Sequence, residues 1–224
     1  NYDFLVKNFN SYTENSTSHK SKEDYEVFGA FLIKTSLPLK KIDDDGNDYL
    51  KPIASFRYSP NNTKNISDKD LRLSYDNIFA LNRIGTNEIV EGGKSLSLGF
   101  EYQNRNKINE KLFSFSLANS ISDRKNSNLP SKTKLNEKRT DLVGKFSFSP
   151  NKVLNFDYSF SYDNNLKDSN YDSISTSINY GILSSTFNFL SSGGVIGNDE
   201  IISNSSKIKL DKEKSLRFNI AKDL

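Results

Sequence analysis

The sequence lacks cysteine entirely and contains one histidine, His19. Without cysteine, a disulfide framework and a thiolate metal site are both excluded. His19 lies in the polar stretch NSTSHKSKED, which is typical of a solvated loop rather than of a Ser-His-Asp triad. We therefore predict no catalytic triad and no cofactor.

One acidic stretch, DDDGND from Asp43 to Asp48, is similar to the start of a calcium-binding loop. The register of an EF-hand fails here, because Lys41 would hold the first ligand position and Pro52 the last. A solvated acidic turn explains the stretch better. We therefore predict no metal site.

Long hydrophobic runs and clustered charges are also missing. Only 34% of the 224 residues are hydrophobic, and the mean hydropathy is -0.66. No run approaches the roughly 18 apolar residues that a transmembrane helix requires. The 31 basic and 28 acidic residues are interspersed along the chain and give a net charge of +3. This distribution argues against a basic face that binds nucleic acid.

What the sequence does contain is an alternation of apolar and polar side chains with a period of two. In GKFSFSPNKVLNFDYSFSYDNN, residues 144–165, aromatic or aliphatic residues repeatedly fall on every second position. The stretch KSLSLGFEY, residues 94–102, alternates in the same way. This period predicts β-strands with one apolar and one polar face. A polar composition combined with such order is typical of a transmembrane β-barrel, whose lumen and loops are hydrophilic.

Strand-like segments recur along the chain, separated by turn or loop sequences. We predict roughly ten to twelve strands. They lie in residues 3–9, 25–35, 53–58, 71–75, 94–102, 111–117, 144–148, 154–162, 173–180, 183–190, 201–210 and 216–220. Tight turns are expected at 149–152 and 211–214, and long polar connections at 11–24 and 119–138. Short turns at one end and long loops at the other are typical of outer-membrane barrels.

Together these features predict an all-β fold, an antiparallel transmembrane β-barrel. A soluble β-sandwich or β-solenoid is the alternative fold, because its strands alternate as well. The apolar positions are rich in aromatic residues, with 16 Phe and 11 Tyr in the chain. This composition favours the membrane barrel, since the buried face of a soluble sheet is normally rich in Val, Ile and Leu.

A more specific signal is the stretch LRLSYDNIFALNRIGTNEIVEGGKSLSLGFEY, from Leu71 to Tyr102. It resembles the barrel domain of the LPS-assembly outer-membrane protein (LptD) family. In that family, a strand ending in an acidic residue is followed by Asn-x-Phe, Asn-Arg and Glu-Gly elements and then by the next strand. The residues that match this pattern are Asp76, Asn77, Phe79, Asn82, Arg83, Glu91 and Gly92.

In physical terms this stretch predicts a strand, a compact polar loop and a second strand. We expect Arg83 and Glu91 to form an ion pair that folds the loop over or into the lumen. Gly92 and Gly93 are expected to adopt positive φ angles at the start of the next strand. Two roles stay open for the matching residues: bracing the loop, or contacting the phosphates of lipopolysaccharide.

The resemblance implies an outer-membrane protein of Gram-negative bacteria that moves lipopolysaccharide without an enzymatic step. Lipopolysaccharide would arrive over a bridge of periplasmic proteins and leave through a lateral opening into the outer leaflet. An outer-membrane lipoprotein of the LptE kind would plug the lumen. A complete small porin or adhesin barrel, and a soluble β-rich binding protein, are the alternative functions.

The extent of the chain also bears on its organisation. The sequence begins without Met or a signal-peptide pattern. The resemblance implies a larger barrel with a periplasmic jellyroll domain and cysteines. We therefore expect residues 1–224 to form a single β-barrel region, an internal fragment of a longer chain.

In a barrel, the two faces of each strand meet different surroundings. The polar residues expected to face the lumen are Ser95, Ser97, Glu101, Lys145, Ser147, Asn155, Asp157 and Ser159. The apolar residues expected to face lipid are Leu96, Leu98, Phe100, Phe146, Phe148, Phe156, Tyr158 and Phe160.

Overall fold

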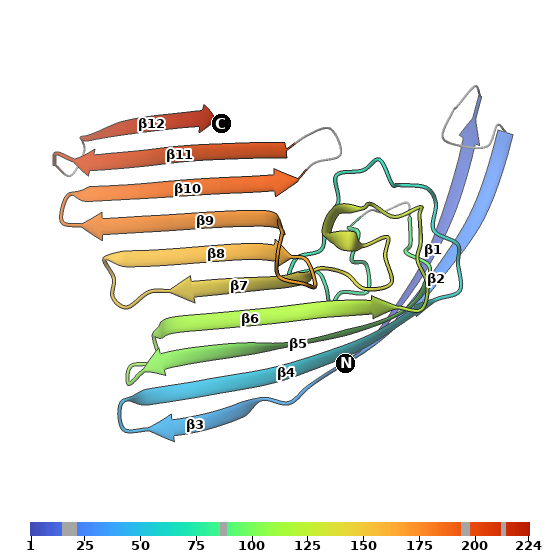
Figure 1. Cartoon of the computed structure of the whole chain (residues 1–224), viewed down its shortest axis with the longest axis horizontal. Helices are drawn as coiled ribbons and strands as arrows, with labels where there is room; N and C mark the ends of the chain where they lie inside the picture. The colour runs from blue at the N-terminus through green and yellow to red at the C-terminus, as the bar shows by residue number, and fades with distance from the viewer. Residues whose placement is uncertain (15–21, 86–88, 194–197, 212–213) are drawn as a thin grey trace.

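The strands form one curved antiparallel sheet (Figure 1). The computed structural model describes residues 1–14, 22–85, 89–193, 198–211 and 214–224, so the predicted loop residue His19 lies outside the described residues. The only helix in the described part is the single 3-10 turn η1 (Lys132–Lys134). No helix among these residues is long and apolar enough to cross a membrane. The all-β prediction is therefore confirmed.

Twelve strands are present in the described residues, and each pairs antiparallel with its neighbours. They are β1 (Tyr2–Thr13), β2 (Lys22–Ser36), β3 (Leu39–Asp43), β4 (Gly46–Ser59), β5 (Gly93–Asn106), β6 (Lys111–Ser122), β7 (Leu142–Phe148), β8 (Leu154–Tyr162), β9 (Ser169–Tyr180), β10 (Leu183–Gly193), β11 (Asn198–Lys209) and β12 (Ser215–Asp223). Their order is β1-β2-β4-β5-β6-β7-β8-β9-β10-β11-β12, with β3 paired to β4. Strands β1 and β12 do not pair with each other in the described structure, so this sheet is open.

The connections differ in length at the two ends of the sheet. Of the two predicted long connections, 119–138 overlaps the observed connection 123–141, whereas residues 11–13 and 22–24 of the other belong to β1 and β2. Short turns such as 149–153 and 181–182 lie at one end. The two long connections, residues 60–92 and 123–141, lie at the other end (Figure 1). We call these two connections the interior loops. Their backbones join each other, since the Ile66 N–H donates to the Asn128 carbonyl over 2.8 Å.

One predicted strand, Leu71 to Tyr75, is wrong. This segment belongs to the first interior loop and has no ladder partner. Its apolar residues Leu73 and Tyr75 are buried, and the Leu73 N–H donates to the Thr133 hydroxyl over 2.9 Å. The alternation of apolar residues therefore reflects burial within a folded loop. Strand β3, which is exposed along its length, was not predicted.

The interior loops pack against one face of the sheet, which we call the inner face. The hydroxyl of Ser97 on β5 donates to the Ile78 carbonyl of the first loop over 3.1 Å. On β7, Lys145 pairs with Asp76 of the same loop. The loops bury an apolar core against this face, formed by Ile53, Ile66, Leu73, Tyr75, Ile78, Phe79, Ile84, Ala118, Leu129, Leu135 and Val143. The loops thus have a hydrophobic reason to lie inside the curve of the sheet.

The opposite, outer face carries a row of aromatic rings across neighbouring strands. Ring centroids are 5.8 Å apart between Phe100 and Phe115, 5.2 Å between Phe113 and Phe146, and 5.7 Å between Phe146 and Phe156. Such cross-strand pairs stabilise an antiparallel sheet through edge-to-face contacts. The residues between them in sequence lie on the inner face, so the two-residue alternation separates two chemically different surfaces.

A glycine lets the first interior loop approach the sheet. Gly99 lies on the inner face of β5, beneath the ring of Phe79. An added Cβ would lie 2.8 Å from Phe79 Cζ and 2.4 Å from the Leu117 carbonyl oxygen. The Leu117 oxygen is a backbone atom, and moving it would distort the ladder between β5 and β6.

We predict that Gly99→Ala destabilises the protein by about 1–3 kcal/mol, the usual cost of overpacking. The free energy of unfolding in detergent measures this effect. Gly29→Ala is the matched control, because nothing lies within 4 Å of a Cβ there. Equal unfolding midpoints for the two variants would contradict the close packing of Phe79 on the sheet.

Candidate functional site

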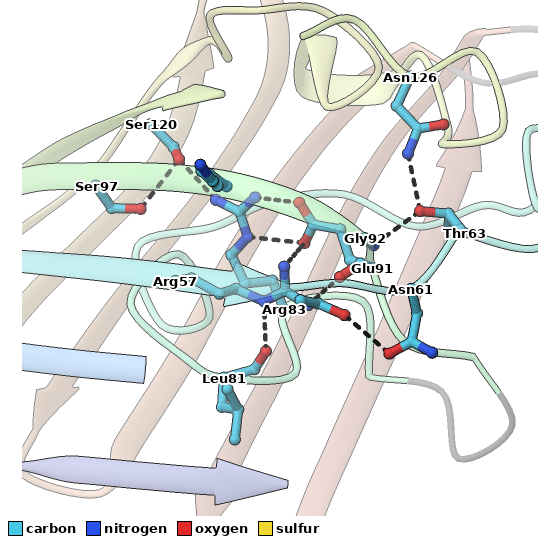
Figure 2. Close-up of polar contacts among 12 residues, drawn as sticks. Arg57, Asn61, Thr63, Leu81, Arg83, Glu91, Gly92, Ser97, Ser120 and Asn126 are labelled. Atoms are coloured by element: carbon cyan, nitrogen blue, oxygen red, sulfur yellow. Dashed lines mark hydrogen bonds and ion pairs between the residues drawn. The ribbon is translucent and has the colours of Figure 1, made fainter. Parts of the chain in front are cut away.

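The site suggested by the sequence is a buried charge cluster between the first interior loop and the sheet (Figure 2). Arg83 and Glu91 come from the loop, and Arg57 comes from the inner face of β4. Their side chains are 1%, 4% and 3% exposed, respectively. Charged groups removed from water this completely require partners of opposite charge.

The ion pair expected from the sequence is present. Arg83 Nε donates to Glu91 Oε2 over 3.0 Å, and Arg83 Nη2 donates to Oε1. This two-pronged contact satisfies both carboxylate oxygens. Arg83 Nη1 donates to the Ser120 hydroxyl on β6 over 2.6 Å, and the Ser120 and Ser97 hydroxyl oxygens lie 3.0 Å apart. The pair thereby connects the loop to two strands.

Arg57 is a member of the cluster that sequence reasoning missed. Its Nε donates to the Leu81 carbonyl over 2.8 Å, and its Nη2 donates to the backbone carbonyl of Glu91. Its Nη1 lies 4.0 Å from Glu91 Oε2. A signal was available, because Arg57 occupies an inner-face position between the small residues Ser55 and Ser59.

The two arginines fix the charge state of Glu91. Burial alone would raise the pKa of this carboxyl, because it disfavours the charged form. The charge and hydrogen bonds of Arg83, followed by the charge of Arg57, outweigh burial and hold the pKa of Glu91 below its ordinary value. Glu91 is therefore ionised at neutral pH.

The two glycines after Glu91 have different roles. Gly93 adopts the expected positive φ, at 95°. Gly92 does not, so that prediction is wrong for this residue. Gly92 is required by close approach instead: a Cβ there would lie 1.9 Å from the Asn61 carbonyl oxygen. Its N–H donates to the Thr63 hydroxyl over 2.9 Å (Figure 2).

The other residues of the resemblance lie around the same loop. Phe79 is buried in the apolar core, and Asn82 is half-buried beside Arg83 in sequence. Asn77 closes a turn: its side chain accepts from the Ser74 N–H over 2.8 Å and donates to the Arg72 carbonyl over 3.0 Å. Asp76 is exposed and forms its ion pair with Lys145.

The polar residues predicted to face a lumen all lie on the inner face. Ser95 and Ser97 are buried beneath the interior loops. Glu101 accepts from Lys51 over 2.8 Å. Asp157 accepts from Ser147 over 2.6 Å and from Asn155 over 2.5 Å, and Ser159 lies on the same face, opposite Ser173. Among the eight, Ser147, Asn155 and Asp157 bond one another, while Glu101 and Lys145 pair with Lys51 and Asp76.

The apolar residues predicted to face lipid all lie on the outer face, away from the interior loops. They are Leu96, Leu98, Phe100, Phe146, Phe148, Phe156, Tyr158 and Phe160. Leu96 and Leu98 are 41% and 50% exposed. Acidic residues also occur on this face, among them Asp172 on β9, which accepts a hydrogen bond from Tyr158 over 2.5 Å. The sequence pattern did not reveal this pairing.

The cluster has no arrangement suited to a reaction. Its carboxylate is saturated by arginine, and among the described residues no group of His, Cys, Asp or Glu is placed to hold a metal ion. The cluster joins the first interior loop to the three strands β4, β5 and β6.

A family model described as LPS transport system D (LptD) matches residues 3–204, which includes strands β1 to β10 and part of β11. The chain belongs to the LptD family. The comparison with curated proteins found no match. Membership confirms the resemblance carried by the Asp76 to Gly92 segment. It assigns the chain to a family of outer-membrane β-barrels that serve lipopolysaccharide transport.

We predict that Arg83→Met destabilises this LptD-family protein by about 3–5 kcal/mol, because it leaves Glu91 buried without its main partner. The double variant Arg83→Met/Glu91→Met should be less destabilised than the single one, since an apolar pair carries no unpaired charge. The unfolding midpoint of each variant in detergent measures its loss of stability relative to the unchanged protein.

The matched control is Lys41→Met, which removes a lysine from an exposed ion pair with Asp43. We expect its unfolding midpoint to equal that of the unchanged protein, because exposed pairs are screened by water. A double variant whose loss equals the sum of the two single losses would show that Arg83 and Glu91 do not act as a pair.

Proposed function

We propose that the chain forms part of the wall of an outer-membrane channel that inserts lipopolysaccharide into the outer leaflet without a chemical step. Family membership supports lipopolysaccharide transport. The observation that carries the finer proposal is the separation of the two faces of the sheet. An aromatic outer face suits hydrocarbon, and an inner face of Ser, Asn, Asp and Lys suits a passing carbohydrate.

Within this proposal, the inner-face residues that are not buried beneath the interior loops, such as Asn155, Asp157 and Ser159, border a hydrophilic passage, while Ser95 and Ser97 lie under the loops. The outer-face set from Leu96 to Phe160 meets the acyl chains of the bilayer. Asp172 is compatible with this placement because it lies near the start of β9, toward the end of the sheet that carries the longer loops, and accepts a hydrogen bond from Tyr158 in the middle of β8. Tyr162, at that end of β8, lies within hydrogen-bond distance of the Tyr158 hydroxyl, and tyrosine is favoured at the boundary between lipid and water.

The residues of the family resemblance act, in this proposal, by bracing the interior loops. Arg83 and Glu91 are almost completely buried and saturate each other. Phosphate recognition needs donors that are free to reach a ligand. Direct contact with lipopolysaccharide is therefore the less favoured of the two roles considered for these residues.

The open sheet bears on the rest of the assembly. Residues 1–224 act as a single barrel region, and further strands outside this chain complete the cylinder, because an open edge would otherwise invite aggregation. An outer-membrane lipoprotein within the lumen and periplasmic bridge proteins are the expected partners. These partners come from the family resemblance.

A small porin is the second candidate, and the interior loops disfavour it. Their apolar core occupies the inner face over β4 to β7, where a porin needs water. A soluble β-rich protein is disfavoured by the exposed outer-face residues Leu96, Leu98 and Phe187.

Reconstitution tests the proposal. The intact protein with its partners, placed in vesicles, should deliver lipopolysaccharide to the far leaflet, where an added lipid A-modifying enzyme detects it. Vesicles without the protein are the control. Uptake of small solutes without delivery of lipopolysaccharide would favour the porin, and recovery without detergent would favour the soluble protein.

The face assignment has its own test. We predict that Phe156→Arg or Tyr158→Arg reduces the yield of folded barrel, because a cation at mid-bilayer costs about 2–4 kcal/mol. Asp157→Arg, the intervening inner-face residue, should assemble far better. Folded yield is measured from the shift in gel mobility without heating. Comparable yields for the three variants would exclude the proposed orientation.

A further inference from the structure

The β11–β12 hairpin gathers positive charge on the inner face. Lys207 on β11 lies opposite Arg217 in the ladder with β12, and Lys209 occupies the next inner-face position toward the turn. Lys214 follows in the turn itself. Ser203 on β11 lies on the inner face, where it accepts a hydrogen bond from Asn188 of β10 over 3.3 Å. Lys207 and Lys209 lie four and six residues further along β11 and therefore share this face.

Like charges opposite one another in a ladder are unfavourable. Two other inner-face lysines have acidic partners: Lys51 pairs with Glu101, and Lys145 pairs with Asp76. Within the described residues, no carboxylate lies within ion-pair distance of Lys207, Lys209 or Arg217. The described part of the hairpin therefore carries Lys207, Lys209 and Arg217 without an ion-pair partner among the described residues, which favours an external anion.

A hollow of about 600 Å³ lies at the same place. Lys207, Lys209 and Lys214 line it together with the apolar side chains of Ile182 and Leu210. Asp211 also lines the hollow, and its carboxylate accepts the backbone N–H of Lys214 over 2.7 Å. The volume is in the range of sites for small ligands and sugars. Cations beside apolar groups suit an amphiphile with an anionic headgroup.

We propose that this hollow binds the phosphate groups of the lipopolysaccharide headgroup at the short-turn end of the inner face. The inference rests on the proposed function and extends it to a specific subsite. The subsite lies at the end where β11 turns into β12 (Figure 1). Residues 205–224 lie beyond the segment matched by the family model. Arginine and lysine hold phosphate through charge-assisted hydrogen bonds.

The test compares two ligands: lipopolysaccharide carrying its lipid A phosphates, and the same preparation after dephosphorylation. Dissociation constants are measured with the intact protein and its partners in detergent. We expect the unchanged protein to bind the phosphorylated form about tenfold more tightly, and increasing salt to reduce this preference. The variant Lys207→Gln/Arg217→Gln should lose the preference.

The matched control is Lys222→Gln, which removes a cation from the outer face of the same strand. It should retain the tenfold preference. Both variants should show the unheated gel mobility of the folded protein, because all three side chains are at least partly exposed. A change confined to the double variant would thus report on ligand binding.

Three results would overturn the proposal. The first is a double variant that keeps the preference for phosphorylated lipopolysaccharide. The second is competition by inorganic phosphate that displaces bound lipopolysaccharide as well as lipopolysaccharide itself does at the same concentration, which would indicate a site for free phosphate. Loss of a co-purified protein with the preference intact would indicate an acidic protein partner. If the unchanged protein binds neither form of lipopolysaccharide, the proposed function fails as well, and that result is distinct from the other three.

Discussion

The buried contact between Arg83 and Glu91 is the interaction on which the arrangement of the interior depends. Two charged groups removed from water are costly unless each finds its counterpart with good geometry. The geometry is met only when the first interior loop, β4 and β6 converge, because Arg57 and Ser120 complete the cluster. An interior loop that left the inner face would take away the Leu81 and Glu91 carbonyls that accept from Arg57, and Arg83 would lose its contact with Ser120, so the cluster favours one position for the loop.

The sheet makes room for that loop through side-chain size. Its inner face beneath the loops carries Ser95, Ser97 and Gly99 on a single strand, while the outer face carries rings. Small inner residues let Phe79 and Ile78 reach the backbone of the wall. The same alternation therefore serves two purposes: it presents an apolar surface outside, and it leaves space inside for a second, hydrophobically packed layer of loops.

The two-residue alternation was enough to predict most strands and the residues on each face, because successive side chains of a strand point to opposite sides of the sheet. The Arg83–Glu91 pair was predictable from the family pattern. The segment from Leu71 to Tyr75 was wrongly predicted as a strand, because apolar and polar residues also alternate in a loop that is buried between the sheet and another loop. Arg57 and the close approach at Gly92 depend on contacts between segments distant in sequence, which no local pattern contains.

These observations divide the inner face into two functional halves. From β4 to β7 it is covered, with Ser55, Ser97 and Val143 buried under the interior loops. Strand β12 is exposed on both faces because it is the edge of the sheet, and the cations of the β11–β12 hairpin stand beside a hollow on the inner face. A molecule moving along the wall would meet the uncovered half, where polar side chains and unbalanced charge are accessible. The covered half holds its own charges in closed pairs, so the uncovered half is where an anionic glycolipid gains most from contact with the wall.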